Sequence, residues 1–141
     1  MINRETNPNI ISLDQGQIFV FGSNTAGRHG KGAAKTALKW GAVYGQATGL
    51  QGRTYGIPTV NKTISNKLPI DIVKDYIDDF IMFATMHPEY TFLVTEIGCG
   101  LAGFTVKQIA PLFKKAVDIE NIHLPAKFWR VLCTSAHKSD N

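Results

Sequence analysis

Residues 91–105, TFLVTEIGCGLAGFT, form the stretch that decides the fold of this sequence. An apolar run typical of a strand passes through Ile97 and changes into a glycine-rich segment, after which a helical pattern begins. Backbone N–H groups at the start of a helix have no partner within the helix, so a turn of this kind can bind an anion. The stretch therefore predicts a strand, a phosphate-binding turn and a helix.

A second stretch, residues 17–32 with the sequence QIFVFGSNTAGRHGKG, repeats this arrangement. Its β-branched and aromatic residues predict a buried strand, and a glycine-rich turn follows directly. Ligands of open α/β sheets bind beyond the carboxyl ends of the strands. We therefore expect the two glycine-rich turns to lie at the same edge of a sheet and ask whether they face one pocket.

Helices are predicted where apolar residues recur every three or four positions. A short helix is expected over residues 32–40. A second begins at Pro69, which suits the first turn of a helix, and ends before residues 87–89. A third begins after Thr105, which forms a Thr-x-x-Gln capping box with Gln108.

Further strands are predicted at residues 53–59, where Pro58 marks the end or an edge position, and at residues 128–132. A short edge strand is expected at residues 10–13. This alternation predicts one α/β domain over residues 1–141, a three-layer α/β/α structure with a mixed sheet and a core at residues 16–133. Irregular structure is expected elsewhere, at residues 1–9, 45–52, 61–68 and 135–141.

The amino-acid composition limits the classes of protein to which the chain can belong. The chain has 141 residues and 15.5 kDa, with 44% hydrophobic and 18% charged residues, which is typical of one soluble globular domain. No apolar run approaches the roughly 20 residues of a membrane span, and the polar N-terminus argues against export, so a cytoplasmic location is expected.

The ionisable residues and cysteines exclude other classes. Two cysteines and four scattered histidines show neither disulfide nor metal spacing, so no metal and no cofactor are expected. The net charge of +4 is spread along the chain. It favours a small anionic ligand, and neither nucleic acid nor a membrane is an expected partner.

Two common nucleotide-binding motifs fit poorly. Gly27 and Gly32 have the glycine spacing of a P-loop, but Ala33 and Ala34 stand where Lys and Ser or Thr are needed. Residues 98–103, GCGLAG, match the glycines of the dinucleotide fingerprint but lie late in the chain, and no acidic residue follows on a strand to bind a ribose. A dinucleotide-binding domain of an oxidoreductase is thus an alternative with the wrong order of elements.

The two turns together resemble the macro domain family of ADP-ribose-binding modules. Within it, the chain looks closest to the branch of the terminal ADP-ribose protein glycohydrolases and to small phage-associated macro-like proteins. The resemblance covers residues 16–133 and implies an ADP-ribose-like ligand, free or attached to an ADP-ribosylated protein. It rests on five segments in order: FVFGSN (19–24), GKGAA (30–34), YGIPT (55–59), KLP (67–69) and IGCGL (97–101).

The resemblance also implies roles for individual residues. The second turn would surround the diphosphate with backbone N–H groups, and Phe104 would cover the sugar. Asn24 would bind the distal ribose beside the first turn. The implied ligand-binding residues are Gly22, Ser23, Asn24, Gly30, Lys31, Gly32, Ala33, Gly98, Cys99, Gly100, Leu101, Ala102, Gly103 and Phe104.

Two residues depart from the pattern that the glycohydrolases of this branch carry. The glycohydrolases of this branch carry a lysine after the Y-x-I-x-T strand and an aspartate after GCGL, where this chain has Val60 and Ala102. Two functions therefore stay open: binding with hydrolysis of an ADP-ribosyl or phosphate bond, and a non-catalytic ADP-ribose reader.

Four residues are candidates for a catalytic role: Asn24, His29, Lys62 and Glu96. His29 would touch phosphate or ribose, or else be solvated on its loop. Glu96 would act as a general base or as a structural hydrogen-bond partner. Cys99 is interpreted as a small residue that fills space, not as a nucleophile.

Overall fold

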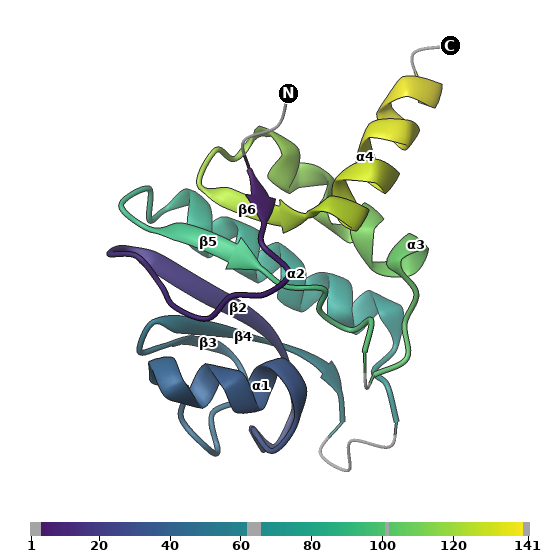
Figure 1. Cartoon of the computed structure of the whole chain (residues 1–141). Helices are drawn as coiled ribbons and strands as arrows, with labels where there is room; N and C mark the ends of the chain where they lie inside the picture. The colour runs from purple at the N-terminus through teal and green to yellow at the C-terminus, as the bar shows by residue number, and fades with distance from the viewer. Residues whose placement is uncertain (1–3, 62–65, 101, 140–141) are drawn as a thin grey trace.

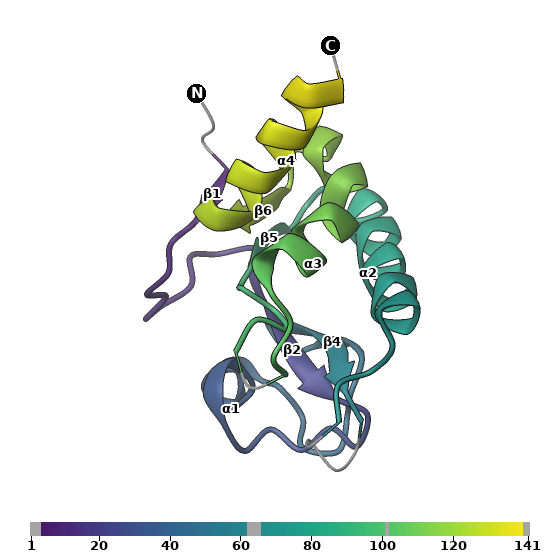
Figure 2. The ribbon, with the colours of Figure 1, turned by 90° about the vertical axis from the view of Figure 1, so that its right-hand side faces the viewer.

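The computed structural model describes residues 4–61, 66–100 and 102–139. Over these residues the chain folds into three layers, and the middle layer is a six-stranded mixed sheet with the strand order β1-β6-β5-β2-β4-β3. Figures 1 and 2 show helix α1 on one face of this sheet and helices α2 and α3 on the other. The three-layer α/β/α fold predicted from the sequence is thus confirmed.

All neighbouring strands are parallel except β3 and β4. Pro58 lies in β4 beyond the residues that pair with β3, so one side of the strand has no neighbour there and a residue without an N–H group is tolerated. The strands are β1 (Glu5–Thr6), β2 (Gln17–Asn24), β3 (Gly49–Gln51), β4 (Thr54–Val60), β5 (Thr91–Val94) and β6 (Ile122–Pro125).

The predicted helices form where the sequence places them. Helix α2 buries Val73, Ile77 and Phe80 on one face, as the spacing requires. The capping box is also present, because the Thr105 hydroxyl accepts from the Gln108 N–H and the Gln108 side chain accepts from the Thr105 N–H. The helices are α1 (Gly32–Ala37) with the 3-10 turn η1 (Leu38–Trp40), α2 (Ile70–Thr85), α3 (Val106–Ile109) with the 3-10 helix η2 (Ala110–Asp118), and α4 (Ala126–Ser139).

Two hydrophobic cores join the layers. The larger core lies between the sheet and α2, η2 and α4, and it contains the rings of Phe80 and Phe113 at a centroid distance of 6.4 Å. The smaller core lies under α1 and contains Phe19 and Phe21. Because Val20 belongs to the larger core, β2 is buried on both faces, as expected of a central parallel strand.

The C-terminal part differs from the sequence prediction. Residues 128–132 belong to α4 and not to a last strand, because Phe128, Trp129 and Leu132 are buried together at helical spacing. The last strand is β6, and the backbone of α4 continues to Ser139, where fraying was expected.

The N-terminal edge of the sheet also differs. The edge strand is β1, not residues 10–13, because Arg4 fixes the chain beside β6. Its guanidinium donates to the carbonyl oxygens of Ala116, Ile119 and Ile122, and its own carbonyl oxygen accepts from the Leu124 N–H. At the other edge, part of the predicted loop 45–52 forms β3.

Candidate functional site

The two glycine-rich turns meet at the carboxyl ends of the adjacent strands β2 and β5. Strand β2 leads into α1 on one face of the sheet, whereas β5 leads into α3 on the other, as Figure 2 shows. Neighbouring strands whose connections leave to opposite faces open a crevice between them, and this is where α/β sheets bind ligands. The turns approach closely here, because a Cβ built at Gly22 would lie 3.3 Å from the Gly98 nitrogen.

The first turn is organised by Asn24. This side chain is 4% exposed; its Oδ1 accepts from the N–H groups of Ala26 and Arg28, and its Nδ2 donates to the Arg28 oxygen at 2.8 Å. Asn24 therefore shapes the turn through backbone contacts, as Asn does in Asx-turns. Its contact with a ribose stays a prediction. Gly30, Lys31 and Gly32 are exposed on the turn.

Two residues join the first turn to the rest of the sheet. The Ser23 hydroxyl donates to the Ala47 oxygen. His29 is only 1% exposed, its Nε2 lies 3.2 Å from Gln51 Oε1 on β3, and its ring meets Phe21 edge-on. The interpretation of His29 as a solvated loop residue is thus wrong, because the ring packs against the sheet and not toward the crevice. This burial leaves no surface for contact with phosphate or ribose in this conformation.

The second turn is closed by its own backbone. The Phe104 N–H donates to the Gly98 oxygen at 2.8 Å, and the Gly103 N–H donates to the Gly100 oxygen at 3.1 Å. Among the hydrogen bonds of the described residues, none is donated by the amides of Gly98, Gly100 or Ala102. Gly98 is buried against Gly22, whereas Gly100 is exposed and Ala102 is partly exposed, so the amides of Gly100 and Ala102 are the donors available to an anion.

Phe104 forms the base of the second turn and does not cover it. The side chain is 6% exposed, and a Cβ at Gly98 would lie 3.2 Å from its ring. The Lys67 ammonium lies over the ring at 5.0 Å from the centroid. Phe104 thus supports the turn from the core, which corrects the expected position over a sugar. Leu101 of the turn and the candidate Lys62 lie outside the described residues.

Cys99 has no nucleophilic character in this site. Burial and the nearby Glu96 carboxylate raise the pKa of its thiol to about 11. The thiol is therefore protonated near neutral pH, and a thiol is a poor nucleophile. Cys99 packs against the larger core, which agrees with the space-filling interpretation.

A cleft of about 580 Å³ is lined by Ala33, directly after the first turn, and by Glu96, just before the second turn, but by none of the described residues of the turns themselves. Its walls come from β1 and the following residues 7–11, from the carboxyl ends of β5 and β6, and from the starts of α1 and α4. They include the predicted site residues Ala33 and Glu96. The Glu96 carboxylate is exposed and lies 3.8 Å from the Lys127 ammonium of α4. Pockets of this volume are typical of small-molecule sites.

Sequence reasoning missed most of the cleft. Thr6, Lys127 and Arg130 line it, but the sequence placed Thr6 in an irregular segment and Arg130 in a strand. The detectable signal was the helical spacing of Phe128, Trp129 and Leu132, which would have turned Lys127 and Arg130 to the opposite face of the helix.

Metal sites and membrane-spanning helices are considered for the described residues alone. No group of three or more His, Cys, Asp or Glu side chains is arranged to hold a metal ion. No helix in these segments has the length and apolar character needed to cross a bilayer.

Comparisons with known proteins identify the fold and nothing finer. No protein-family model matches the chain, and no curated protein does either. A solved structure described as a protein of unknown function from Bacteroides thetaiotaomicron superposes with a TM-score of 0.59. It is 16% identical, and the match covers 82% of this chain and 88% of that chain. At this level of identity the likeness concerns the fold alone.

Proposed function

We propose that this protein binds ADP-ribose, or a related ADP-ribosyl nucleotide, in the crevice between the two turns and in the adjoining cleft. The observation that carries the proposal is the close approach of Gly22 and Gly98 at the carboxyl ends of β2 and β5, beside a cleft of about 580 Å³. A ligand with a diphosphate and a nucleoside matches this combination of an anion-binding turn and a cleft of small-molecule size.

The two halves of the ligand would meet different chemistry. The unpartnered amides of Gly100 and Ala102 suit a diphosphate, whose about two charges can be stabilised by backbone donors without a lysine clamp. The buried side chains of Phe19 and Pro125 line the cleft and offer an apolar floor to a nucleoside. The macro-type motifs quoted above support the same assignment.

A non-catalytic reader is the second candidate, and specific observations favour it. Asn24 is occupied by its own turn, His29 is buried and Cys99 is protonated. Ala102 supplies no carboxylate at the turn. Glu96 is the predicted catalytic residue that reaches the cleft, so hydrolysis of an ADP-ribosyl or phosphate bond would depend on it as a general base.

Calorimetric titration with ADP-ribose tests the binding. We expect an affinity near 1 μM, which corresponds to about −8 kcal/mol, and weaker binding of AMP. Gly100→Glu should abolish binding by placing a negative charge at the diphosphate, whereas the uncharged Gly100→Gln should keep most of it. Gly100 is suitable because its Cβ position is open, while Gly103 has a φ of +84° that strains any side chain.

Three outcomes separate the possibilities. Absence of binding at millimolar ADP-ribose would refute the proposal. Equal affinities of Gly100→Glu and wild type would move the diphosphate away from the second turn. Release of ADP-ribose from an ADP-ribosylated protein, or of phosphate from ADP-ribose 1″-phosphate, would establish an enzyme if Glu96→Gln abolished it. No release from either would establish a reader.

A further inference from the structure

One wall of the cleft is cationic in a way that binding of ADP-ribose does not require. Lys127 and Arg130 line the cleft from the beginning of α4, three residues apart and so on the same helical face. The first turn of α4 contains no acidic residue. Cations are unfavourable near a helix N-terminus, where the macrodipole is positive. These two charges therefore do not stabilise the helix that carries them.

Arg130 is the cation of this wall that is open to a ligand. Lys127 has the Glu96 carboxylate 3.8 Å away, whereas the ion pairs of the described residues do not include Arg130. Glu5 is the other acidic residue that lines the cleft. It lies on β1, where the cleft borders a second hollow of about 390 Å³. A planar guanidinium without a carboxylate partner is well suited to bidentate contact with a phosphate.

The floor of the cleft contributes a buried hydroxyl group. Thr6 is 6% exposed, and its Oγ1 has no hydrogen-bond partner among the described residues. Thr6 pairs with Pro125, so its side chain lies on the same face of the sheet as Pro125, and both residues line the cleft. Buried polar atoms are nearly always hydrogen-bonded. Because Oγ1 itself is fully covered, a ligand oxygen would reach it only after the side chains that cover it move.

We propose that the α4 end of the cleft is a phosphate-monoester subsite, and that the preferred ligand is an ADP-ribosyl nucleotide with an additional phosphate on its nucleoside half. The inference rests on the proposed function, because a diphosphate bound at the two turns would place the nucleoside half of the ligand in the cleft. The monoester accepts hydrogen bonds from the Arg130 guanidinium and the Lys127 ammonium, both of which line the cleft. A ribose hydroxyl lacks the charge that these cations would pair with.

The test compares ligands that differ only in this phosphate. ADP-ribose is titrated against ADP-ribose phosphorylated at the 2′ or 3′ oxygen of the adenosine ribose, and AMP against adenosine 2′,5′- or 3′,5′-bisphosphate. We expect one phosphorylated form of each pair to bind wild type at least tenfold more tightly at low salt. Arg130→Gln should reduce this preference to within twofold, and Lys127→Gln should reduce it in part. Lys107→Gln, an exposed residue of α3 outside the cleft, should retain it.

Different results refute different proposals. If ADP-ribose binds without any preference for a phosphorylated form, the subsite is wrong and the proposed function stands. If neither ADP-ribose form binds, but a bisphosphate binds tenfold better than AMP in an Arg130-dependent way, the subsite stands and the proposed function fails. If Arg130→Gln and wild type show the same preference, the phosphate lies elsewhere and the subsite is refuted.

Discussion

Gly22 determines how closely the two turns approach each other. A side chain here would contact the Gly98 nitrogen, and a side chain at Gly98 would contact Phe104 and Ile109. The absence of a Cβ at Gly22 thus lets the second turn lie directly against β2, and its absence at Gly98 lets the turn pack on Phe104 and Ile109. Glycine at both positions was part of the sequence prediction, but the reason for it at Gly22 is close packing between loops and not a left-handed backbone.

Replacing Gly22 tests this packing. Gly22→Ala places a Cβ 3.3 Å from the Gly98 nitrogen, so the second turn must move by a few tenths of an ångström. We expect the affinity for ADP-ribose, measured by calorimetry, to fall about tenfold, or about 1.4 kcal/mol, while the protein stays folded. Gly16→Asn at the opposite end of β2 is the matched control, because Asn tolerates a positive φ and this position is far from the crevice along the strand. Equal losses in both variants would contradict the argument.

Secondary-structure elements could be predicted where their signal is local. Strand β2, helix α2 and the capping box at Thr105 follow from residues close together in sequence, and all three are present. Strand β1 is two residues long and exists because Arg4 binds carbonyl groups more than a hundred residues away. Helix α4 was mistaken for a strand because aromatic and β-branched residues dominate its short window, and only the core shows the helical face.

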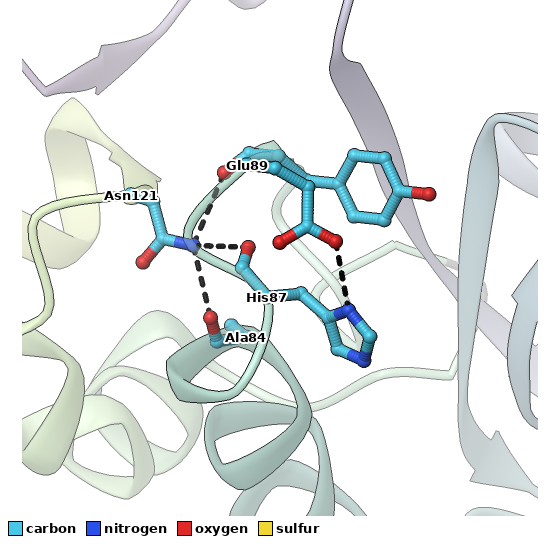
Figure 3. A network of polar contacts seen from close by, with 5 residues as sticks. Ala84, His87, Glu89 and Asn121 are labelled. Atoms are coloured by element: carbon cyan, nitrogen blue, oxygen red, sulfur yellow. Dashed lines mark hydrogen bonds and ion pairs between the residues drawn. The ribbon is translucent and has the colours of Figure 1, made fainter.

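Asn121 joins several elements at the edge of the sheet opposite the crevice. Its Nδ2 lies 2.9, 3.1 and 3.1 Å from the carbonyl oxygens of Ala84, His87 and Tyr90. Figure 3 shows the Asn121 side chain directed at the end of α2, toward Ala84 and His87. The side chain thereby connects the end of α2 to the starts of β5 and β6. This amide adds a donor at the end of α2, where the Ala84 oxygen also accepts from the His87 N–H.

Asn121→Asp tests the contribution of this amide. The carboxylate keeps the size of the side chain but faces three carbonyl oxygens without a donor, so we expect a loss of about 1–3 kcal/mol in the free energy of unfolding. Urea denaturation measures the loss, and an unchanged m-value would show that the denatured state is unaffected. Asn66→Asp, at an exposed position, should change stability by less than about 0.5 kcal/mol. Wild-type stability of Asn121→Asp would refute the role given to Asn121.

Over the whole molecule, the candidate site divides into a predictable and an unpredictable part. The meeting of the two turns could be predicted, because both follow strands and the carboxyl ends of parallel strands share an edge. The cleft could not, since Thr6, Glu96 and Arg130 come from three distant segments whose neighbourhood depends on the order β1-β6-β5. Nothing in the local sequence specifies that order.

The stability of the whole molecule at alkaline pH depends on two side chains whose pKa is raised by burial, the Cys99 thiol and the Tyr55 hydroxyl. Burial and Glu96 raise the pKa of the Cys99 thiol from 9.0 to about 11, and burial and Asp79 raise the pKa of the Tyr55 hydroxyl from 10.0 to about 12. A raised pKa means that folding favours the neutral form, so the unfolded chain loses its protons first. The stabilisation is complete below about pH 9 and disappears as the pH rises from 9 to 12.

The upward direction of both pKa shifts predicts how the free energy of unfolding depends on pH. The free energy of unfolding, measured by urea denaturation, should fall between pH 9 and 11 more steeply in wild type than in the double variant Cys99→Ala, Tyr55→Phe, which retains the Tyr55 ring against Phe80 and Phe83. The two proteins should show parallel curves from pH 7 to 8.5, because both acids are then neutral in the folded and unfolded chains. Curves that stay parallel up to pH 11 would contradict the raised pKa values of both groups, and with them the argument that the Cys99 thiol is not a nucleophile.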